Sequence, residues 1–464
     1  MKRPRIVCTV APKDWFGGRD YLGGQVMTDA VAGLGYELFL LDTGCFLLQD
    51  GPGIEDALRR LRVFAPDVAI STPNASYGLA VQIDVAGTMC NVFTDVLRIP
   101  LALCWDDPLG QFAGQFLSPL PATPAESRPG AMQRLRSGIN QPLIFHYGWD
   151  TGHIQSMVDL GLLAEGAAVF DMLPAKAAYL DYGLTHGVSS SFDQDVCFAG
   201  NVYLNQITAD PLAQIPEIAH LVERITARKL ADFRHSAWDL LIDEIQRMPD
   251  ADLVRLKFSP DETAFWQAYR YIVWVAVNTR VRMGVLSSVR RPVDFYGGFA
   301  DPEGLDGLKA SCNIRYRGSV DYITELPRVF HRSRITVDVT NQLAQRSVPG
   351  KFFECFAAGG FMLIDRRPDL IAAFGDAGEA ISYSSVDELN AKIDYYLTHE
   401  SARRDLILYF QERMRREHSP EAYVFRMITD LQERAAARAR LSAPAAPCSF
   451  VPVSQLDPAE FTTS

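Results

Sequence analysis

Short runs of β-branched and aromatic residues alternate with helical patterns along the first third of the chain. RIVCTV (5–10) comes first, and YELFLLD, DVAIS, PLALCWDD and LIFHYGWD follow it. Amphipathic stretches such as IEDALRRLRVF lie between these runs. Strands that alternate with helices form a parallel sheet with helices on both faces. Ligands of such sheets bind beyond the carboxyl ends of the strands, where the polar residues of these runs fall.

A second series of the same kind starts at DVCFAGN (195–201). It continues with VDFYGGF, CNIRYRGSV, RITVDVTN, FMLID and AISY. Between its first two strands lies a segment, about 205–290, with helical spacing and aromatic residues that we expect to serve mainly packing. The sequence therefore predicts an α/β protein with two open sheets in tandem and a helical insertion in the second.

The length allows two such domains, because 464 residues exceed the size at which one hydrophobic core stops growing. We expect an N-terminal domain over 1–185 and a C-terminal domain over 186–420. A helix over 421–443 would pack back on the first domain, and 444–464 would form a loosely ordered tail. A composition of 48% hydrophobic and 22% charged residues is that of a soluble globular protein.

The net charge of -11 argues against a general surface for nucleic acid or anionic membrane. The eight cysteines include no Cys-x-x-Cys pair, which favours reduced, buried thiols over disulfides or a zinc site. The apolar run after the basic start is too short for an export signal. YIVWVAV (271–277) is also too short for the roughly 20 residues of a membrane span. We expect a cytoplasmic protein without a transmembrane segment.

The segment RSVPGKFFECFAAGGFMLID (346–365) places two charges among phenylalanines. Ser347 is expected to cap a helix that starts at Val348, and Gly359–Gly360 to end it. Helical spacing puts the phenylalanines on one face and Lys351 and Glu354 on the other, which we expect to be open to a ligand.

The types of these two residues suit a nucleotide. A carboxylate such as Glu354 can accept hydrogen bonds from two adjacent ribose hydroxyls. Lys351 adds charge suited to a diphosphate, helped by the positive end of the helix dipole. The alternative is a surface ion pair at i, i+3, and periodicity alone does not decide between the two.

The stretch from VPGKFFECFAAGG to HESARRDLI resembles the C-terminal domain of group 1 glycosyltransferases, and most closely the spore-maturation CgeB-like family. In that family an R/K-x-F-E-x-x-A-x-G-G segment precedes a strand. DVCFAGNVY also resembles its "DVSFVGN" strand, and IPLALCWDDP with HYGWDTGHI resembles its N-terminal half. The resemblance covers most of the chain outside the insertion and the tail, and it is most specific over 346–410.

The resemblance implies a GT-B fold, with two Rossmann-like domains that face each other across a cleft. It also implies transfer of a sugar from a nucleoside-diphosphate donor to an acceptor hydroxyl. Glu354 matches the glutamate that holds the donor ribose, and Lys351 matches a basic position that we assign to the diphosphate. The loop positions that also match are Gly200 and Asn201 on the diphosphate side, and Arg317 and Gly318 at the nucleobase.

One position departs from the family pattern. Many retaining relatives carry a first glutamate eight positions before the ribose glutamate, and this chain has Arg346 there. The usual pair of glutamates is incomplete, so the stereochemical course, retaining or inverting, stays open.

The glycine-rich FGGRDYLGGQ follows the first strand. Gly17 and Gly18 supply backbone that can approach phosphate or sugar oxygens at the mouth of the cleft. The stretch lacks the G-x-G-x-x-G spacing of a dinucleotide site, and a plain strand-to-helix turn explains it equally well.

Polar residues at two strand ends of the first sheet are candidates for the general base that an inverting transferase needs. They are Asp106, Asp107, His146, Asp150 and His153. Asp107 could instead turn the chain before Pro108, and Asp150 could cap a helix that begins at Thr151. No Asp-x-Asp segment is placed like a metal site, so we expect metal-independent donor binding and no cofactor.

Two other functions remain open from the sequence. One is a non-catalytic relative that binds sugar nucleotides, which Arg346 motivates. The other is a nucleotide-sugar epimerase of the same fold. The acceptor could be a glycan, a lipid carrier, a protein or a small molecule, and the insertion could shape acceptor choice or form a homodimer.

Overall fold

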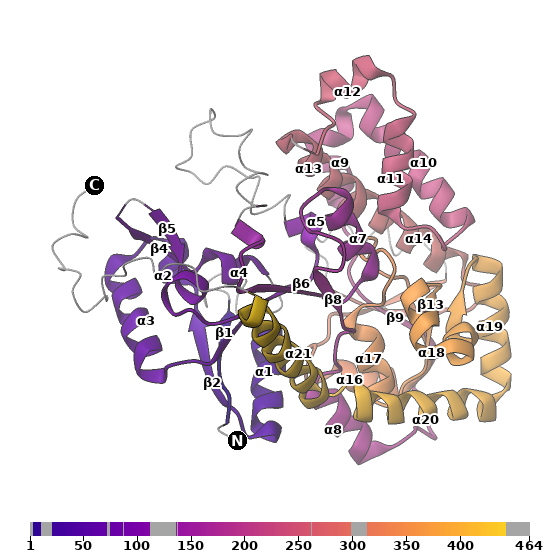
Figure 1. Cartoon of the computed structure of the whole chain (residues 1–464). Helices are drawn as coiled ribbons and strands as arrows, with labels where there is room; N and C mark the ends of the chain where they lie inside the picture. The colour runs from indigo at the N-terminus through magenta and orange to yellow at the C-terminus, as the bar shows by residue number, and fades with distance from the viewer. Residues whose placement is uncertain are drawn as a thin grey trace.

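The computed structural model of the chain describes residues 3–10, 21–71, 75–86, 88–111, 136, 138–260, 262–297 and 313–441 (Figure 1). The predicted loop residues Gly17 and Gly18 and the predicted tail lie outside these ranges.

The first domain is built on a six-stranded parallel sheet with the order β2-β1-β3-β6-β7-β8. Its strands are β1 Arg5–Val10, β2 Glu37–Asp42, β3 Val68–Ser71, β6 Leu101–Trp105, β7 Ile144–Gly148 and β8 Ala168–Phe170. The sequence predicted all of them except β8, a three-residue edge strand. Because the sheet extends from β1 in both directions, its switch point lies between β1 and β3.

Short helices and one hairpin complete this domain. They are α1 Tyr21–Leu34, α2 Gly44–Leu47, α3 Gly51–Phe64, α4 Ala75–Ala80, β4 Gln82–Val85, β5 Thr88–Asn91, the π-helix η1 Val92–Val96, α5 Pro108–Gln111, α7 Thr151–Asp159 and α8 Ala177–His186. Helix α1 begins at Tyr21, so it takes in the second half of the glycine-rich stretch that we expected to be a loop.

The second domain repeats the pattern, with a six-stranded parallel sheet in the order β11-β10-β9-β12-β13-β14. Its strands are β9 Gln194–Ala199, β10 Val293–Tyr296, β11 Ile314–Gly318, β12 Ser333–Asp338, β13 Met362–Asp365 and β14 Ser382–Tyr383. Here the order reverses between β9 and β12, so the ligand crevice of this sheet is expected at their carboxyl ends.

The insertion between β9 and β10 is helical, as predicted, and projects from the second domain at the top of Figure 1. It consists of α9 Leu204–Ala209, η4 Pro211–Gln214, α10 Pro216–Ala231, α11 Ala237–Gln246, α12 Asp250–Leu256, α13 Thr263–Tyr269, the π-helix η5 Arg270–Val277 and α14 Asn278–Ser288. Its aromatic side chains pack together, since the rings of Trp238 and Trp266 stack 6.4 Å apart and both are buried. The packing role expected for them is confirmed.

The remaining helices follow the second sheet. They are α16 Leu326–His331, α17 Gly350–Ala357, α18 Pro368–Ile381, α19 Val386–Thr398, α20 Glu400–Glu417 and α21 Pro420–Leu441. Two tandem Rossmann-like domains with a helical insertion in the second are the GT-B architecture, which confirms the predicted fold class.

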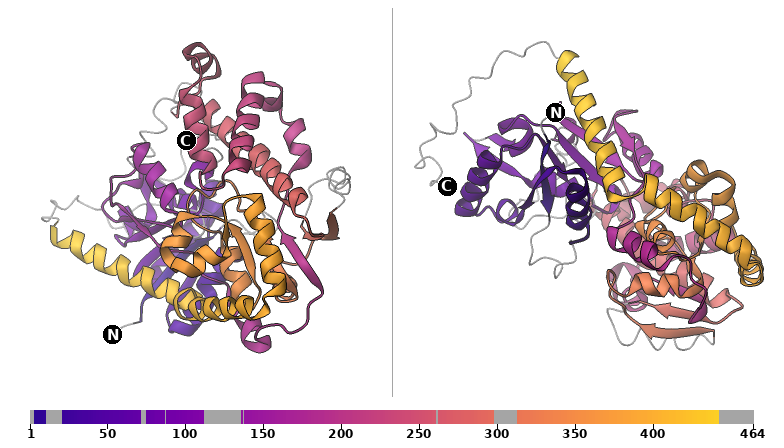
Figure 2. Two further views of the ribbon diagram at one scale, coloured as in Figure 1. Left: turned by 90° about the vertical axis from the view of Figure 1, so that its right-hand side faces the viewer. Right: turned by 90° about the horizontal axis from the view of Figure 1, so that it is seen from below.

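Helix α21 leaves the second domain and lies beside α1 across the sheet of the first (Figures 1 and 2). Its buried side chains, among them Val424, Met427 and Leu431, share one core with Ile6 and Ile70 of that sheet. The two domains are therefore connected twice, by the linker before β9 and by α21, which packs on the first domain.

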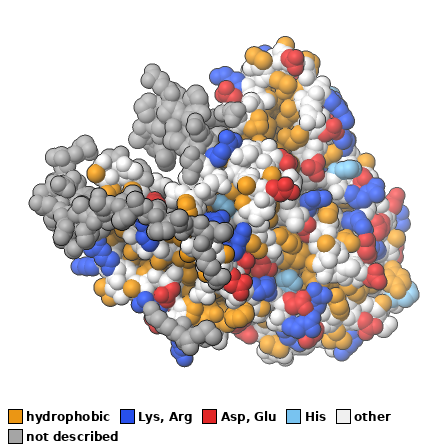
Figure 3. Space-filling model, in the orientation of Figure 1, with side chains coloured by type: hydrophobic (Ala, Val, Ile, Leu, Met, Phe, Trp, Pro, Cys, Tyr) orange, Lys and Arg blue, Asp and Glu red, His pale blue; other side chains and the backbone are white. Residues whose placement is uncertain are grey.

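The surface in Figure 3 carries acidic and basic side chains interspersed on the described part of the face shown. None of the helices in the described ranges combines the length and the apolar character needed to cross a membrane.

Leu431→Ala should lower the free energy of unfolding by about 2–5 kcal/mol, because Leu431 is 0% exposed where α21 packs on the first sheet. Phe425→Ala is the matched control, since Phe425 lies on the same helix with 53% of its surface exposed. Urea unfolding curves of both variants test this, and equal midpoints would contradict the packing described for α21.

Candidate functional site

The carboxyl ends of the two sheets meet at Asp150, which follows β7 and is 0% exposed. Its carboxylate accepts hydrogen bonds from the first turn of α7, at Gly152 N (2.8 Å) and His153 N (3.2 Å). It also accepts from three backbone N–H groups of the second domain, those of Gln345 (2.8 Å), Arg346 (3.0 Å) and Ser347 (3.1 Å). One carboxylate therefore joins the start of α7 to the loop between β12 and α17.

Further polar contacts surround this junction. The Thr151 backbone N–H and hydroxyl donate to the carboxylate of Asp369 on α18, at 3.0 and 2.6 Å. The Ser156 hydroxyl donates to the Gln345 side-chain oxygen at 3.0 Å. The contact between the domains is thus a hydrogen-bonded one, made largely by the first two turns of α7.

Two of the five candidate bases have structural roles here. Burial alone would raise the pKa of Asp150, but His153 and the three N–H groups of 345–347 outweigh it and lower the pKa. His146 is also buried; it accepts from Trp105 Nε1 at 3.0 Å through Nδ1, and its Nε2 lies 3.0 Å from the Ile139 carbonyl oxygen. Burial lowers the pKa of His146 to about 4, so its ring stays neutral at pH 7.

The other three candidates lie close together at the ends of β6 and β7. Asp106 is exposed, whereas Asp107 is half-buried and its Oδ1 accepts from Gly110 N at 3.0 Å, as the turn role anticipated. Burial raises the pKa of Asp107 to about 6, although the nearby charge of His153 acts to lower it. Burial would lower the pKa of His153, but Asp150 and Asp107 raise it.

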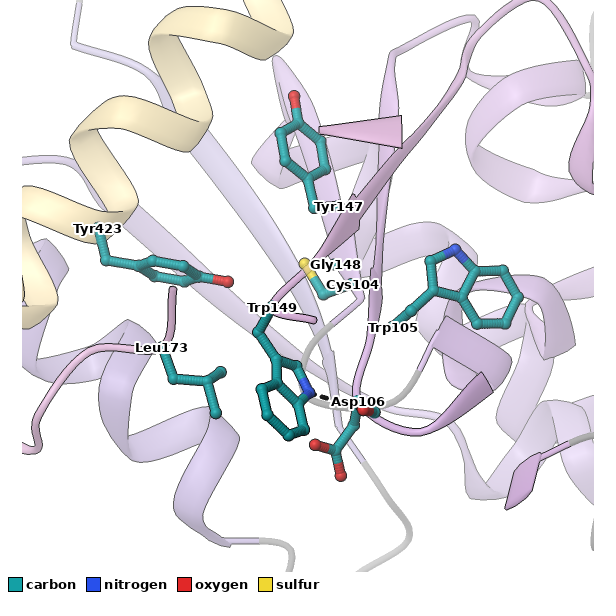
Figure 4. A pocket seen from close by; sticks show the side chains of 8 residues that line it. All are labelled: Cys104, Trp105, Asp106, Tyr147, Gly148, Trp149, Leu173 and Tyr423. Carbon is teal, nitrogen blue, oxygen red and sulfur yellow. Dashed lines mark hydrogen bonds between the residues drawn. The ribbon is translucent and has the colours of Figure 1, made fainter. Parts of the chain in front are cut away.

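A recess opens beside Asp106, where β6 and β7 end (Figure 4). It is a small recess, partly open to solvent, and its walls are mostly apolar. The residues that line it are Cys104, Trp105, Asp106, Tyr147, Gly148, Trp149, Leu173 and Tyr423. Figure 4 shows the rings of Trp149 and Tyr423 and the side chain of Leu173 around the opening, with Trp105 and Tyr147 directed away from it.

In the second domain, Lys351 lies at the switch point of the sheet. Its Nζ forms an ion pair with Asp338 Oδ1 at 2.5 Å and donates to the Ala199 carbonyl at 2.8 Å, so it bridges the ends of β12 and β9. The predicted loop residue Gly200 is adjacent, because a Cβ built on it would lie 3.6 Å from Nζ. The structure therefore brings Lys351 and Gly200 together.

Arg282 on α14 is a member of this site that the sequence reading missed. Its guanidinium is buried, donates to the carbonyls of Asn201 (2.7 Å) and Val339 (3.1 Å), and lies over the Phe198 ring. Asn201 thus contributes its backbone to a loop that an arginine of the insertion holds. The helical pattern of the insertion gave no signal that this residue reaches the strand ends.

Three glycines adjoin where β9, β10 and β11 end. A Cβ on Gly297 would lie 2.0 Å from the Gly200 carbonyl oxygen, so only glycine fits there. Gly318 accepts from the Gly297 N–H at 3.1 Å and has a φ of +94°. Next to it, Arg317 pairs with Asp294 of β10, and about half of its side chain is exposed.

Glu354 differs most from expectation. Its side chain is 0% exposed, and both carboxylate oxygens have partners: Oε1 pairs with the Lys176 ammonium and Oε2 accepts from the Tyr322 hydroxyl. Every residue from 352 to 358 is buried, so the open charged face that we expected on this helix is wrong. Helical periodicity could not show that residues 176 and 322 cover this face.

Helix α17 also begins later than predicted. It starts at Gly350 after the N-cap residue Pro349, and the Ser347 hydroxyl is buried without a partner in the described part of the chain. Its end is as predicted, since Gly359 has a φ of +82° and the Gly360 N–H bonds back to the Cys355 carbonyl at 2.9 Å. Arg346 has an exposed side chain, and its backbone N–H serves Asp150.

Within the described residues, no cluster of three or more His, Cys, Asp or Glu could hold a metal ion. Cationic side chains at the strand ends of the second sheet are the groups available there for a phosphate.

Asp150→Asn should lower the free energy of unfolding at pH 7 by about 3 kcal/mol, since hydrogen bonds to a charged acceptor are lost. The pKa of Asp150 is lowered in the folded state, so its contribution is present above the unfolded value near 4 and is lost as pH falls through the folded value. Denaturant unfolding across pH 3–7 should therefore show a difference from wild type that shrinks at the acid end. Asp159→Asn, at an exposed position of the same helix, is the control, and a pH-independent difference would contradict this role.

A family model described as glycosyl transferase-like matches residues 282–429, which is less than half of the chain. No curated protein matches the sequence. The chain is similar to solved structures at low identity. HepE of Anabaena, solved with UDP and glucose, has a TM-score of 0.43 and 9% identity, with 94% of this chain and 100% of that chain covered.

A glycosyltransferase of Rickettsia africae has a TM-score of 0.46 and 9% identity, over 94% of this chain and 99% of that chain. AviGT4, a glycosyltransferase of avilamycin A biosynthesis, has a TM-score of 0.45 and 11% identity, over 93% and 98%. Because these TM-scores lie below 0.5, they carry no weight for the function. The segment 282–429, from α14 into α21, is glycosyl transferase-like in sequence.

Proposed function

We propose that this protein is a glycosyltransferase that moves a sugar from a nucleoside-diphosphate donor to an acceptor hydroxyl. The observation that carries the proposal is Lys351 at the switch point of the second sheet, within the segment that matches the glycosyl transferase-like family. A lysine that bridges two strand ends beside a glycine loop is suited to a diphosphate.

The donor diphosphate would lie at the ends of β9 and β12. An ammonium has three N–H donors, and Lys351 donates one of them to the Ala199 carbonyl while it forms an ion pair with Asp338, so donor capacity is left for a phosphate oxygen. Gly200 and Gly297 pack against each other at these strand ends, and Arg282 adds a second positive charge. With two cations against Asp338, the site has a net charge that favours an anion.

The nucleoside end of the donor would extend toward Gly318 and Arg317, where β11 ends. For Glu354 to hold the ribose, as proposed from the resemblance, ribose hydroxyls must replace the Tyr322 hydroxyl on its Oε2. Donor binding is then coupled to movement of the segment that carries Tyr322. Metal independence and a cytoplasmic location are parts of this proposal.

Asp106 is the general base we propose, because it is exposed beside the recess while Asp150 and His146 are buried. The acceptor hydroxyl would give its proton to Asp106, and the acceptor oxygen would bond to the anomeric carbon. The bond from that carbon to the diphosphate oxygen breaks, and the nucleoside diphosphate leaves with its electron pair.

A non-catalytic sugar-nucleotide-binding protein is the second candidate. The observation that favours it is that the charges of Lys351 and Glu354 are both balanced inside the protein, by Asp338 and Lys176. Such a protein would bind donors without turnover across a panel of acceptors. A nucleotide-sugar epimerase would instead turn over donor with no acceptor present.

The double variant Lys351→Met with Asp338→Asn should bind nucleoside diphosphates about tenfold or more weakly than the single variant Asp338→Asn. Removing both members of the pair avoids leaving the buried Asp338 unpaired, which would destabilise the protein. Thermal shift with UDP, GDP, ADP and CDP measures the binding, because a ligand of the folded state raises its melting temperature.

If donor binding is metal-independent, EDTA should leave the rise in melting temperature that nucleoside diphosphates cause unchanged. Equal affinity in the double and single variants would contradict the placement of the diphosphate at Lys351.

Asp106→Asn should reduce sugar transfer by about 100-fold or more, which is the usual contribution of a general base. In wild type the rate should rise as pH passes about 6, because Asp107 then becomes charged and strengthens the neighbouring base. Asp107→Asn should keep most activity at pH 7 and flatten this rise. An Asp106→Asn enzyme with wild-type kcat would show that another group takes the proton.

A further inference from the structure

The first turn of α14, the last helix of the insertion, carries three buried polar side chains. They are Asn278, Thr279 and Arg282. Residues three and four apart share one face of a helix, so Asn278 and Thr279 lie on the same face as Arg282. Buried polar groups need hydrogen-bond partners, and the partners of this face are backbone groups of the second sheet.

Asn278 and Thr279 bind the two loops at the switch point of that sheet, one loop each. Thr279 Oγ1 accepts from the backbone N–H of Tyr203, which follows β9, at 3.0 Å. Asn278 Oδ1 accepts from the backbone N–H of Gln342, which follows β12, at 3.2 Å. Two neighbouring residues of the insertion therefore fix the backbone on both sides of the crevice where ligands of such a sheet bind.

Arg282 joins the same two loops through their carbonyl groups. It donates to the carbonyl oxygens of Asn201 after β9 and of Val339 after β12, and Lys351 donates to that of Ala199. A carbonyl oxygen that faces a phosphate repels it, because both carry negative charge. Since these three carbonyl oxygens are bound by cations, the repulsion is reduced at the ends of both strands.

Arg282 and Lys351 also lie near one aromatic ring. The Arg282 guanidinium is 5.9 Å from the centroid of the Phe198 ring on β9, and the Lys351 Nζ is 5.3 Å from it. The insertion therefore reaches the strand end at which we place the donor diphosphate.

The segment before α14 strengthens this contact. Helix α14 continues directly from the π-helix η5, with helical backbone angles at the junction, and π-helices are rare and often found at functional sites. The Trp274 ring of η5 meets the Tyr203 ring edge-on at 6.1 Å, and the Tyr271 hydroxyl donates to the Ile207 carbonyl at 2.8 Å. Both contacts are with the segment that follows β9.

We propose that the first turn of α14 is a positioning element of the donor site, in which Asn278, Thr279 and Arg282 hold the β9 and β12 loops in the geometry that receives the diphosphate. This proposal rests on the proposed function and gives the insertion a role on the donor side. Neither acceptor choice nor dimer formation, the two roles considered from the sequence, requires the insertion to bind these loops.

The physical reason is that loops already in place cost less to order when a ligand binds. A variant that loses one of these bonds should therefore lose affinity for the donor. Variants elsewhere on α14 should not.

Isothermal titration of the full chain with UDP, GDP, ADP and CDP tests the proposal. Thr279→Val keeps the shape of the side chain and removes the acceptor for Tyr203, so it should weaken binding of the diphosphate that binds wild type by about fivefold or more. Thr279→Ser keeps the hydroxyl and should bind within about twofold of wild type. Ser287→Ala is the control, because it removes an exposed hydroxyl that bonds to Met283 of the same helix, and it should bind as wild type does.

Arg282→Lys separates position from charge and keeps the experiment decisive if Thr279→Val fails to fold. Lysine retains the positive charge but lacks the planar fork that donates to two carbonyls, so binding should weaken by about tenfold or more. A purely electrostatic role would leave the affinity almost unchanged.

Wild-type affinity in Thr279→Val or in Arg282→Lys, or an equal loss in Thr279→Val and Thr279→Ser, would overturn the proposal. A lower melting temperature of the ligand-free variants with unchanged affinity would also overturn it, because it would show a role in stability alone. The two levels of the proposal fail differently. If no nucleoside diphosphate binds wild type, the donor assignment itself is rejected, whereas binding that the α14 variants keep unchanged rejects only the positioning role.

Discussion

The contact that the rest of the site depends on is the Asp150 carboxylate with its ring of backbone N–H groups. An ionised carboxylate that is 0% exposed needs compensation, and here His153 and the main-chain donors of α7 and of residues 345–347 provide it. The same loop is held from its other side by Arg367, which donates to the carbonyls of Ala344 (3.0 Å) and Gln345 (3.3 Å). The loop before α17 is therefore fixed through both its N–H and its C=O groups, and with it the position of Lys351.

A second property of the site is that its charges are balanced internally before any ligand arrives. Lys351 pairs with Asp338 and Glu354 with Lys176, and three of these four side chains are nearly or fully buried. Buried ion pairs hold both side chains in place, at the cost of their desolvation. A donor then binds by adding hydrogen bonds to groups already in position, or by exchanging with a neutral partner such as Tyr322, which requires no new buried charge.

The positions of the strands could be predicted from the sequence, but the residues that pack over the helices could not. Apolar runs ending in polar residues located β1, β6, β7 and β12 correctly, because the core of a parallel sheet demands such runs. The edge strand β8 has only three residues, too few for a pattern. For Asp150, the local cap on α7 was predictable from HYGWDT, whereas its bonds to residues 345–347 join positions about 200 apart. The prediction that Glu354 lies on an open face was wrong for the same reason, because its partner Lys176 is 178 positions away.

The contacts of α21 and of Asp150 determine which residues are held in each domain. Helix α21 is fastened to the first sheet by its buried face and by Arg426, which pairs with Asp171 through two hydrogen bonds of 2.8 and 3.1 Å. Trp149, Asp106 and Tyr423 therefore lie together on the first domain. Lys351 belongs to the other unit. The bonds of Asp150 across the junction hold the start of α7 and the loop before α17 together, and thereby set the position of the second unit relative to the first.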